Sequence, residues 1–381
     1  MRTGMKISCC FLTLVLLTGC WDAKVIQNLT YITAIGVDYV GDEYICYAQV
    51  SNISNIAKQE SRNVGKQPSI WVAKGVGKTF TDALVSIYRF SQVRLFWGHI
   101  KSVVLSENAI RKGINPIFDM MNRYREIRYN IWVYGTNMPL DQVLIEPSII
   151  NLSPQESTLE NPEEIYKQSS FIPPLYWYRL IALTKEPVNV AAIPSITISN
   201  KNWKENGKPQ ALLLVNGAYY LNLDHMAGWL SLTDLRGLRW LENQTVRTPL
   251  TATLNDKPIA DLVVVKPRQS IKLIEKGAEL HFDVTVKARA YVNQLHENVS
   301  EDVIEAQAAK IIEAEIKDTY KKGAQLGIDT LKLELYVYRN HPHKWNEIHD
   351  KHKKILHEHA LDTVKVKVHI MHSGKFKQRV R

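Results

Sequence analysis

Residues 280–292, Leu-His-Phe-Asp-Val-Thr-Val-Lys-Ala-Arg-Ala-Tyr-Val, alternate apolar and mostly polar side chains from end to end. Successive side chains of a β-strand point to opposite faces, so this period of two predicts a long strand with one face in a core and the other in water. The run at 364–370 alternates in the same way and predicts a final strand. The second half of the chain therefore contains a half-buried sheet.

A long helix is predicted between these two strands. Ser300 suits the N-cap position, and Glu301 and Asp302 place carboxylates in the first turn. The apolar stripe at helical spacing consists of Ile304, Ala308, Ile312, Ile316 and Tyr320, with Gly323 as the expected end. We also expect a helix at about 231–241 and a strand at 331–338. An antiparallel sheet with helices on one face accounts for this half.

The first half mixes short strands and helices. Strand-like runs lie at 33–38, 44–50, 102–105 and 129–134, and helix starts are indicated at Thr79, at Asn115-Pro116 and at Pro139. The predicted class for the whole chain is α+β (mixed α/β), multi-domain, with antiparallel or mixed sheets and helices packed on them.

The chain has 381 residues, too many for one ordinary core, so two or three domains are expected. The polar stretch 200–210 is the clearest break in the apolar pattern. We therefore predict a cleaved signal peptide at 1–19, an N-terminal α/β module at 20–200 and a C-terminal α+β module at 201–381. A subdivision of the last module would give three domains in all.

The N-terminus carries a secretion signal. Arg2 and Lys6 precede an apolar run at 7–17, which is too short to span a bilayer. The run ends in Leu17, Thr18, Gly19 and Cys20, which resemble the bacterial lipobox. That resemblance implies cleavage after Gly19 and a lipid on Cys20. The competing interpretation is a non-lipidated signal with a chance cysteine.

The net charge and the cysteine content limit the possible binding partners and disulfides. The formal net charge is +10, and removal of Arg2 and Lys6 leaves +10 − 2 = +8. A basic surface suits binding to nucleic acid or to an anionic membrane. Because no nucleic-acid-binding motif occurs, we favour an anionic lipid surface over nucleic acid. Ordinary scattered surface charge explains the positive net charge equally well. Cys46 is the one cysteine left after Cys9, Cys10 and Cys20 are accounted for, so no intrachain disulfide is expected, and Cys46 is predicted to be a buried strand residue.

Catalytic and cofactor motifs are not found in the sequence. It has no nucleophile elbow, P-loop, dinucleotide-binding turn, Cys-x-x-Cys or His-Glu-x-x-His, so no enzyme activity and no cofactor are predicted. Histidines do crowd the C-terminal stretch, at His341, His343, His349, His352, His357, His359, His369 and His372. Their spacing matches no closed metal site and lysines intervene, so we predict a solvated basic face and no metal.

Several short motifs occur along the chain, and their order is more specific than any one of them alone. The first are Gly19-Cys20-Trp21-Asp22, Ala34-Ile35-Gly36-Val37-Asp38, His99-x-Lys101 and Arg123-x-x-Glu126-x-Arg128. The later ones are Met226-Ala227-Gly228-Trp229-Leu230-Ser231, Arg236-Gly237-Leu238-Arg239-Trp240, Pro342-x-x-Trp345 and the last strand with Gly374. Together they resemble the Ger(x)C family, the lipoprotein C subunits of bacterial spore germinant receptors. The segment Ala23-Lys24-Val25 and the high histidine content depart from the family pattern.

The resemblance implies a non-enzymatic lipoprotein on the outer face of the spore inner membrane. Its partners would be the two integral membrane subunits, A and B, of the same receptor, with any contact to the nutrient germinant indirect, and the lipid bilayer through acylated Cys20. It implies a mixed α/β fold of more than one domain with no known cofactor. His99, Arg123, Arg128 and Trp229 are candidate partner-facing residues, although structural roles for them fit the sequence as well.

A second function stays open at this point. A tethered solute-binding lipoprotein would capture the nutrient itself. It would need a deep interdomain cleft with converging polar groups.

Overall fold

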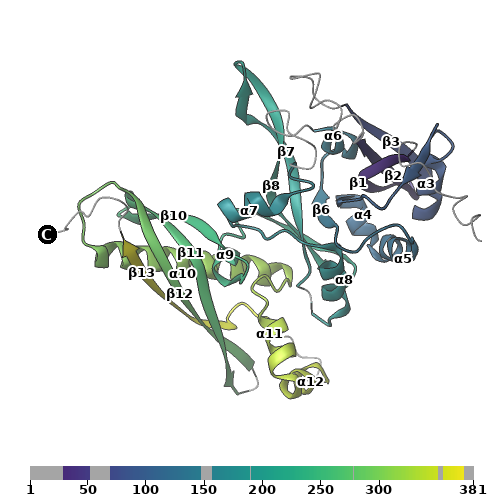
Figure 1. The fold of residues 1–381 in the computed structure, drawn as a ribbon. Helices are drawn as coiled ribbons and strands as arrows, with labels where there is room; N and C mark the ends of the chain where they lie inside the picture. Colours follow the sequence, from purple (N-terminus) through teal and green to yellow (C-terminus); the bar gives the residue numbers. More distant parts are fainter. Residues whose placement is uncertain are drawn as a thin grey trace, which may run out of the picture.

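The computed structural model describes residues 29–51, 69–146, 157–188, 190–277, 279–350 and 355–372. Within them the chain forms two β-sheets with helices packed on each (Figure 1). The predicted class, α+β (mixed α/β) and multi-domain with helices packed on the sheets, is confirmed.

The first sheet has nine strands. In order across the sheet they are β3 (Ile70–Gly77), β2 (Glu43–Ser51), β1 (Leu29–Val40), β5 (Ser102–Ser106), β6 (Trp132–Thr136), β7 (Ala192–Glu205), β8 (Lys208–Asn222) and β9 (His225–Ser231), and β4 (Arg94–Phe96) pairs with the start of β1. Strands β1, β5, β6 and β7 run parallel in the centre, and antiparallel hairpins form both flanks. All residues of β5 and β6 are buried, as expected for parallel strands covered on both faces.

Helices cover both faces of this sheet. They are α3 (Phe80–Ile87), α4 (Glu107–Lys112), α5 (Asn115–Arg123), α6 (Leu140–Ile145), α7 (Pro162–Gln168) and α8 (Trp177–Lys185). Helices α3, α4, α5 and α8 contribute to the larger core cluster on one face, and α6 contributes to a separate cluster on the other. Cys46 is fully buried on β2, as predicted, and burial raises the pKa of its thiol to about 12.

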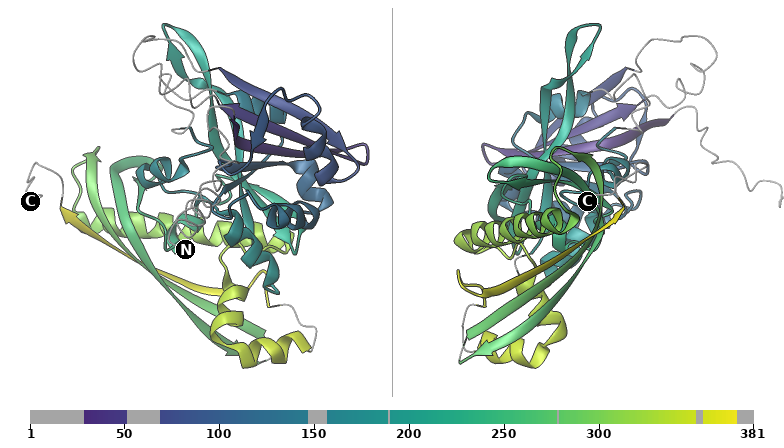
Figure 2. Two further views of the ribbon diagram at one scale, coloured as in Figure 1. Left: turned by 45° about the vertical axis from the view of Figure 1, so that its right-hand side comes forward. Right: turned by 90° about the vertical axis from the view of Figure 1, so that its left-hand side faces the viewer.

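The second sheet has the strand order β10 (Arg247–Leu254), β11 (Lys257–Lys276), β12 (Glu279–Leu295) and β13 (Leu361–His372). Its helices are α9 (Leu238–Leu241), α10 (Glu301–Leu326), α11 (Leu333–Asn340) and α12 (Pro342–Asp350). The alternation at 280–292 forms β12, with Val284 and Val286 buried and Lys287 exposed. Helix α10 lies along one face of the sheet (Figure 2). Ser300 accepts a hydrogen bond from the backbone N–H of Val303, which confirms the predicted N-cap.

Three local expectations are corrected by the structure. Most of the run 331–338 lies in helix α11, which begins at Leu333, instead of in a strand. The buried Asp329 carboxylate accepts hydrogen bonds from the N–H groups of Leu333 and Glu334 and so starts a helix there. Strand β13 is parallel to β12, because the connection through α10 to α12 returns the chain to the same end of the sheet. The helix expected at 231–241 is reduced to the four residues of α9.

The polar stretch 200–210 is the tip of the long β7–β8 hairpin. Asn206 and Gly207 form its turn, both with positive φ (49° and 82°), which is the conformation that two-residue hairpin turns require. The chain therefore remains in the first sheet through β8 and β9, and it passes to the second sheet only after Ser231. In the sequence, this hairpin is indicated by the Asn206-Gly207 dipeptide between strand-like runs. The prediction instead placed a domain boundary in this stretch.

A buried ion pair joins the segment between the sheets to helix α10. The Arg239 side chain is 3 % exposed, and its Nη2 donates to both carboxylate oxygens of Glu315 at 2.9 Å. Trp240 Nε1 donates to the same carboxylate at 2.7 Å. Gly237 lies so close to α10 that an added Cβ would come within 2.3 Å of the Glu315 carbonyl oxygen. The motif Arg236-Gly237-Leu238-Arg239-Trp240 is thus a docking site for α10.

We predict that Glu315→Ala lowers the free energy of unfolding by ~3–5 kcal/mol, because it leaves the Arg239 guanidinium buried without its counter-charge. The matched control is Glu313→Ala on the same helix. Glu313 forms an exposed pair with Lys317, which is worth about 0–1 kcal/mol. Urea titrations followed by circular dichroism measure both variants. A loss below about 1 kcal/mol for Glu315→Ala would show that the pair does not hold the junction.

Candidate membrane- and partner-facing site

The predicted lipid anchor lies outside the described residues. Cys20 and the lipobox residues Leu17, Thr18 and Gly19 precede Leu29, at which the description begins. Leu29 is the first residue of β1 and follows Cys20 by nine positions. The surface around the start of β1 is therefore the described part of the fold nearest in sequence to the anchor.

An aromatic cluster lies at this end of β1. Leu29 and Tyr31 pair with Arg94 and Phe96 of β4. The Tyr31 ring centroid is 4.7 Å from that of His99 and 5.9 Å from that of Phe96, both edge to face. We call the surface formed by Tyr31, Arg94, Phe96, His99 and Arg128, together with Phe90 and Val93 of the preceding loop, the entry patch.

The entry patch combines exposed apolar side chains with basic ones. Phe90 is 81 % exposed and Val93 is 49 % exposed, in the loop between α3 and β4. Large exposed apolar side chains beside polar ones are typical of protein or membrane contact sites. Neither residue was predicted as a contact residue, because both follow directly on the helical run at 80–88 and were read as part of it. In the sequence they are marked only as two apolar residues just after the end of an amphipathic helix.

The positive charge of Arg128 is close enough to affect the pKa of His99. Partial burial lowers the pKa of His99, and the charges of Arg128 and Lys101 lower it further. Both effects favour the neutral form of the His99 imidazole. Arg128 has no ion-pair partner among the described residues, so its charge is available to an external anion. The structure thus brings together two of the four residues predicted from the sequence.

A partly buried hydrogen-bond network holds the patch in shape. The Glu126 carboxylate accepts a hydrogen bond from the backbone N–H of Trp97 at 3.0 Å and lies 3.7 Å from the Arg94 guanidinium. Trp97 Nε1 donates to the Tyr88 hydroxyl at 2.8 Å, and that hydroxyl is 2.6 Å from the hydroxyl of Tyr124. Glu126 of the Arg-x-x-Glu-x-Arg motif is therefore a positioning residue for β4.

Arg123 and Trp229 lie apart from the entry patch. Arg123 pairs with Asp119 one helical turn away on α5, in an exposed ion pair that contributes little. Trp229 lies on β9, the last strand at the other side of the sheet, and is 39 % exposed. Its ring covers Gly217, where a Cβ would come within 2.8 Å of the indole, and it lines a pocket of about 360 Å³.

A second pocket, of about 450 Å³, lies between the two halves and bears on the solute-binding alternative. Its wall includes polar residues from both halves, among them Arg179, Glu242, Lys332 and Arg339. However, Lys332 pairs with Glu242, and Arg339 pairs with Glu186 at 2.6 Å. Two of the basic side chains of the wall, Lys332 and Arg339, are therefore already paired within the protein.

The described part of the chain contains no helix that is both long enough and apolar enough to cross a membrane.

Comparison with known proteins places the chain in a family. Two family models match it in succession: the spore germination protein N-terminal domain over residues 22–198, and the spore germination B3/GerAC-like C-terminal domain over residues 216–374. In Bacillus subtilis (strain 168), spore germination protein KC is 27% identical over 391 residues, covering 95% of this chain and 94% of that protein. Spore germination protein A3 of the same organism is 25% identical over 292 residues, covering 74% and 72%.

The fold itself is similar to a solved structure. The crystal structure of the GerBC protein superposes with a TM-score of 0.56 at 16% sequence identity, covering 88% of this chain and 96% of that one. The two consecutive family models, the motifs in their order and this shared fold agree: the chain belongs to the Ger(x)C family of spore germination proteins.

Proposed function

We propose that this chain is the lipid-tethered, non-enzymatic C subunit of a nutrient germinant receptor. It would act with two integral membrane subunits, A and B, at the outer face of the spore inner membrane to initiate germination. The observation that carries this proposal is the position of Cys20. The predicted lipid site precedes β1 by nine residues, and β1 begins inside the entry patch.

The length of the tether limits where the entry patch can lie. Nine residues span at most about 30 Å when fully extended, at ~3.3–3.6 Å per residue. A lipid on Cys20 therefore keeps the start of β1 within about 30 Å of the bilayer surface, where membrane subunits expose their outer segments. A single acyl chain binds a membrane only marginally, so the diacylglyceryl form would provide the stable anchor.

The composition of the entry patch suits this location. Phe90 and Val93 offer apolar surface, and Arg128 offers a positive charge without an internal partner among the described residues. Aromatic and arginine side chains are enriched in protein interfaces. The partly buried Trp97–Glu126 network fixes the patch before contact, which lowers the entropic cost of binding. We therefore assign His99 and Arg128 to the contact with the membrane subunits.

Spores that carry Cys20→Ala should lose the protein from the membrane fraction and lose their response to one nutrient, because the acyl chains provide the anchoring energy. Membrane fractionation and germination assays on a panel of nutrients measure both effects. Cys46→Ala is the matched control, since Cys46 is buried in β2 and distant in sequence from the anchor. A normal response to every nutrient despite loss from the membrane would contradict the receptor assignment.

Arg128→Glu should slow germination several-fold while the protein remains in the membrane fraction, because it reverses the charge of the entry patch without touching the anchor. The control is Arg268→Glu, the same change at an exposed position on β11 of the second sheet. Spore germination is followed by the loss of optical density, and immunoblotting checks the protein level. Equal rates for the two variants would exclude the entry patch from the receptor contact.

A further inference from the structure

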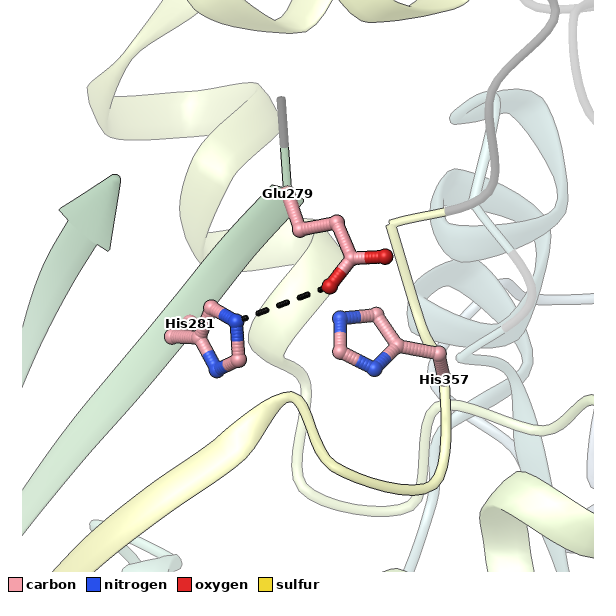
Figure 3. Close-up of side chains that lie close together, drawn as sticks. All are labelled: Glu279, His281 and His357. Carbon is pink, nitrogen blue, oxygen red and sulfur yellow. Dashed lines mark ion pairs between the residues drawn. The ribbon is translucent and has the colours of Figure 1, made fainter. Parts of the chain in front are cut away.

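Three potential metal ligands meet at one end of the second sheet. Glu279 and His281 stand two residues apart at the start of β12, and His357 lies in the segment that leads into β13 (Figure 3). One ligand atom from each side chain lies within 4.8 Å of those of the other two. The sequence separates His357 from the other two residues by helices α10, α11 and α12, so the fold alone brings them together.

The side chains face one another. His281 Nε2 is 3.8 Å from Glu279 Oε2, and the rings of His281 and His357 meet edge to face with centroids 5.3 Å apart. Figure 3 shows both imidazoles beside the Glu279 carboxylate. The three groups therefore converge on one small volume.

Two ring nitrogens in this cluster lack hydrogen bonds within the described structure. His281 is 8 % exposed, and its Nδ1 is buried without a partner; His357 Nε2 is buried without one as well. Buried polar atoms are nearly always satisfied, and an exception points to a water molecule or an ion. An ion in the cluster would satisfy His357 Nε2, and it would bind His281 through Nε2, the nitrogen nearest Glu279, so the unpartnered His281 Nδ1 lies outside the proposed site.

The backbone fixes the positions of both histidines. The carbonyl oxygen of His357 accepts hydrogen bonds from the Tyr320 hydroxyl at 2.5 Å and from the N–H of Ala360 at 3.0 Å. The Ala360 carbonyl in turn accepts from the N–H of Phe282, next to His281. The backbones at both histidines are thus joined by one hydrogen-bonded ladder, while the Glu279 side chain is exposed.

The surrounding charges permit a cation here. Lys276, at the end of β11, donates to both carboxylate oxygens of Asp362 at 2.8 Å. This pair neutralises the Lys276 charge, and the lysine lowers the pKa of Asp362 so that the acid stays ionised. Glu279 then adds a negative charge that a divalent ion would complement.

We propose that Glu279, His281 and His357 bind one divalent transition-metal cation, with zinc as the best fit. Two imidazole nitrogens and one carboxylate oxygen are a known zinc donor set, which leaves a fourth position for water. Ligand atoms bound at 2.0–2.2 Å from tetrahedral zinc lie about 3.4 Å apart, so the three side chains, whose ligand atoms lie within 4.8 Å of one another, would draw slightly closer around the ion. This assignment departs from the sequence-based expectation of no metal, which considered the C-terminal histidines without His281.

The bound ion would join the start of β12 to the segment that precedes β13. A ligand that binds only the folded state stabilises it by mass action, so the proposed ion adds a metal-dependent cross-link to the second sheet.

The test uses the mature chain from residue 20 onward, with Cys20→Ser to remove the thiol and the lipid, and without a histidine tag. After treatment with a chelator, calorimetry with zinc chloride should show about one equivalent bound with micromolar or tighter affinity. Cobalt chloride should give visible absorption bands of a tetrahedral site. Zinc should also raise the melting temperature.

His281→Ala and His357→Gln should each weaken zinc binding at least tenfold and abolish the rise in melting temperature. The matched controls are His296→Ala, which removes a histidine paired with Asp261 at 2.8 Å on the same sheet, and His369→Ala on β13. Circular dichroism confirms that each variant is folded. Less than about 0.2 equivalent of zinc bound by the parent chain, or binding unchanged by the His281 and His357 substitutions, overturns the proposal.

Discussion

The buried pair between Arg239 and Glu315 is the interaction on which the docking of α10 at the junction of the two halves depends. Arg239 lies between the rings of Phe171 and Trp240, with its guanidinium carbon 4.6 and 4.5 Å from their centroids. Burial lowers the pKa of Arg239, and Glu315 opposes that shift, so the charge persists because its partner is present. A buried charge without such a partner is strongly destabilising.

Apolar packing completes the junction around this pair. Ile328, just after α10, is buried against Ala218 and Leu230 of the first sheet. On the other side, the N–H of Ser170 donates to the carbonyl of Arg247 at 2.7 Å, which ties the segment after α7 to β10. Contacts from both directions therefore fix α10, and with it the second sheet, against β8 and β9.

Sequence periodicity predicted the elements whose pattern was long and unambiguous. The alternation at 280–292 and at 364–370 produced β12 and β13, and the stripe from Ile304 to Tyr320 produced α10. Short runs were less certain, because an apolar run such as 331–338 fits both a strand and a helix. There the decision came from Asp329, whose carboxylate caps α11, and the cap was not considered.

The candidate site could be predicted only in part from the sequence. It depends on the pairing of strands that are distant in sequence, and no local sequence pattern indicates such pairing. His99 and Arg128 were identified from motifs, but their neighbour Tyr31 comes from a parallel pairing between β1 and β4. The Asn206-Gly207 turn likewise carried a clear hairpin signal that composition obscured, since the flanking residues are polar. Polar composition indicates exposure, and an exposed segment is as often a hairpin tip as a linker.

The short tether and the locked junction act together on the whole molecule. Nine residues between Cys20 and β1 hold the start of the first sheet within about 30 Å of the bilayer, if the lipid is present. Arg239 and Glu315 fix α10 against the segment that leaves the first sheet, and the contacts of Arg239 with Phe171 and of Ile328 with Ala218 and Leu230 tie the second sheet to the first. The proposed receptor subunit would then meet its partners as a single body whose orientation is set at the entry patch.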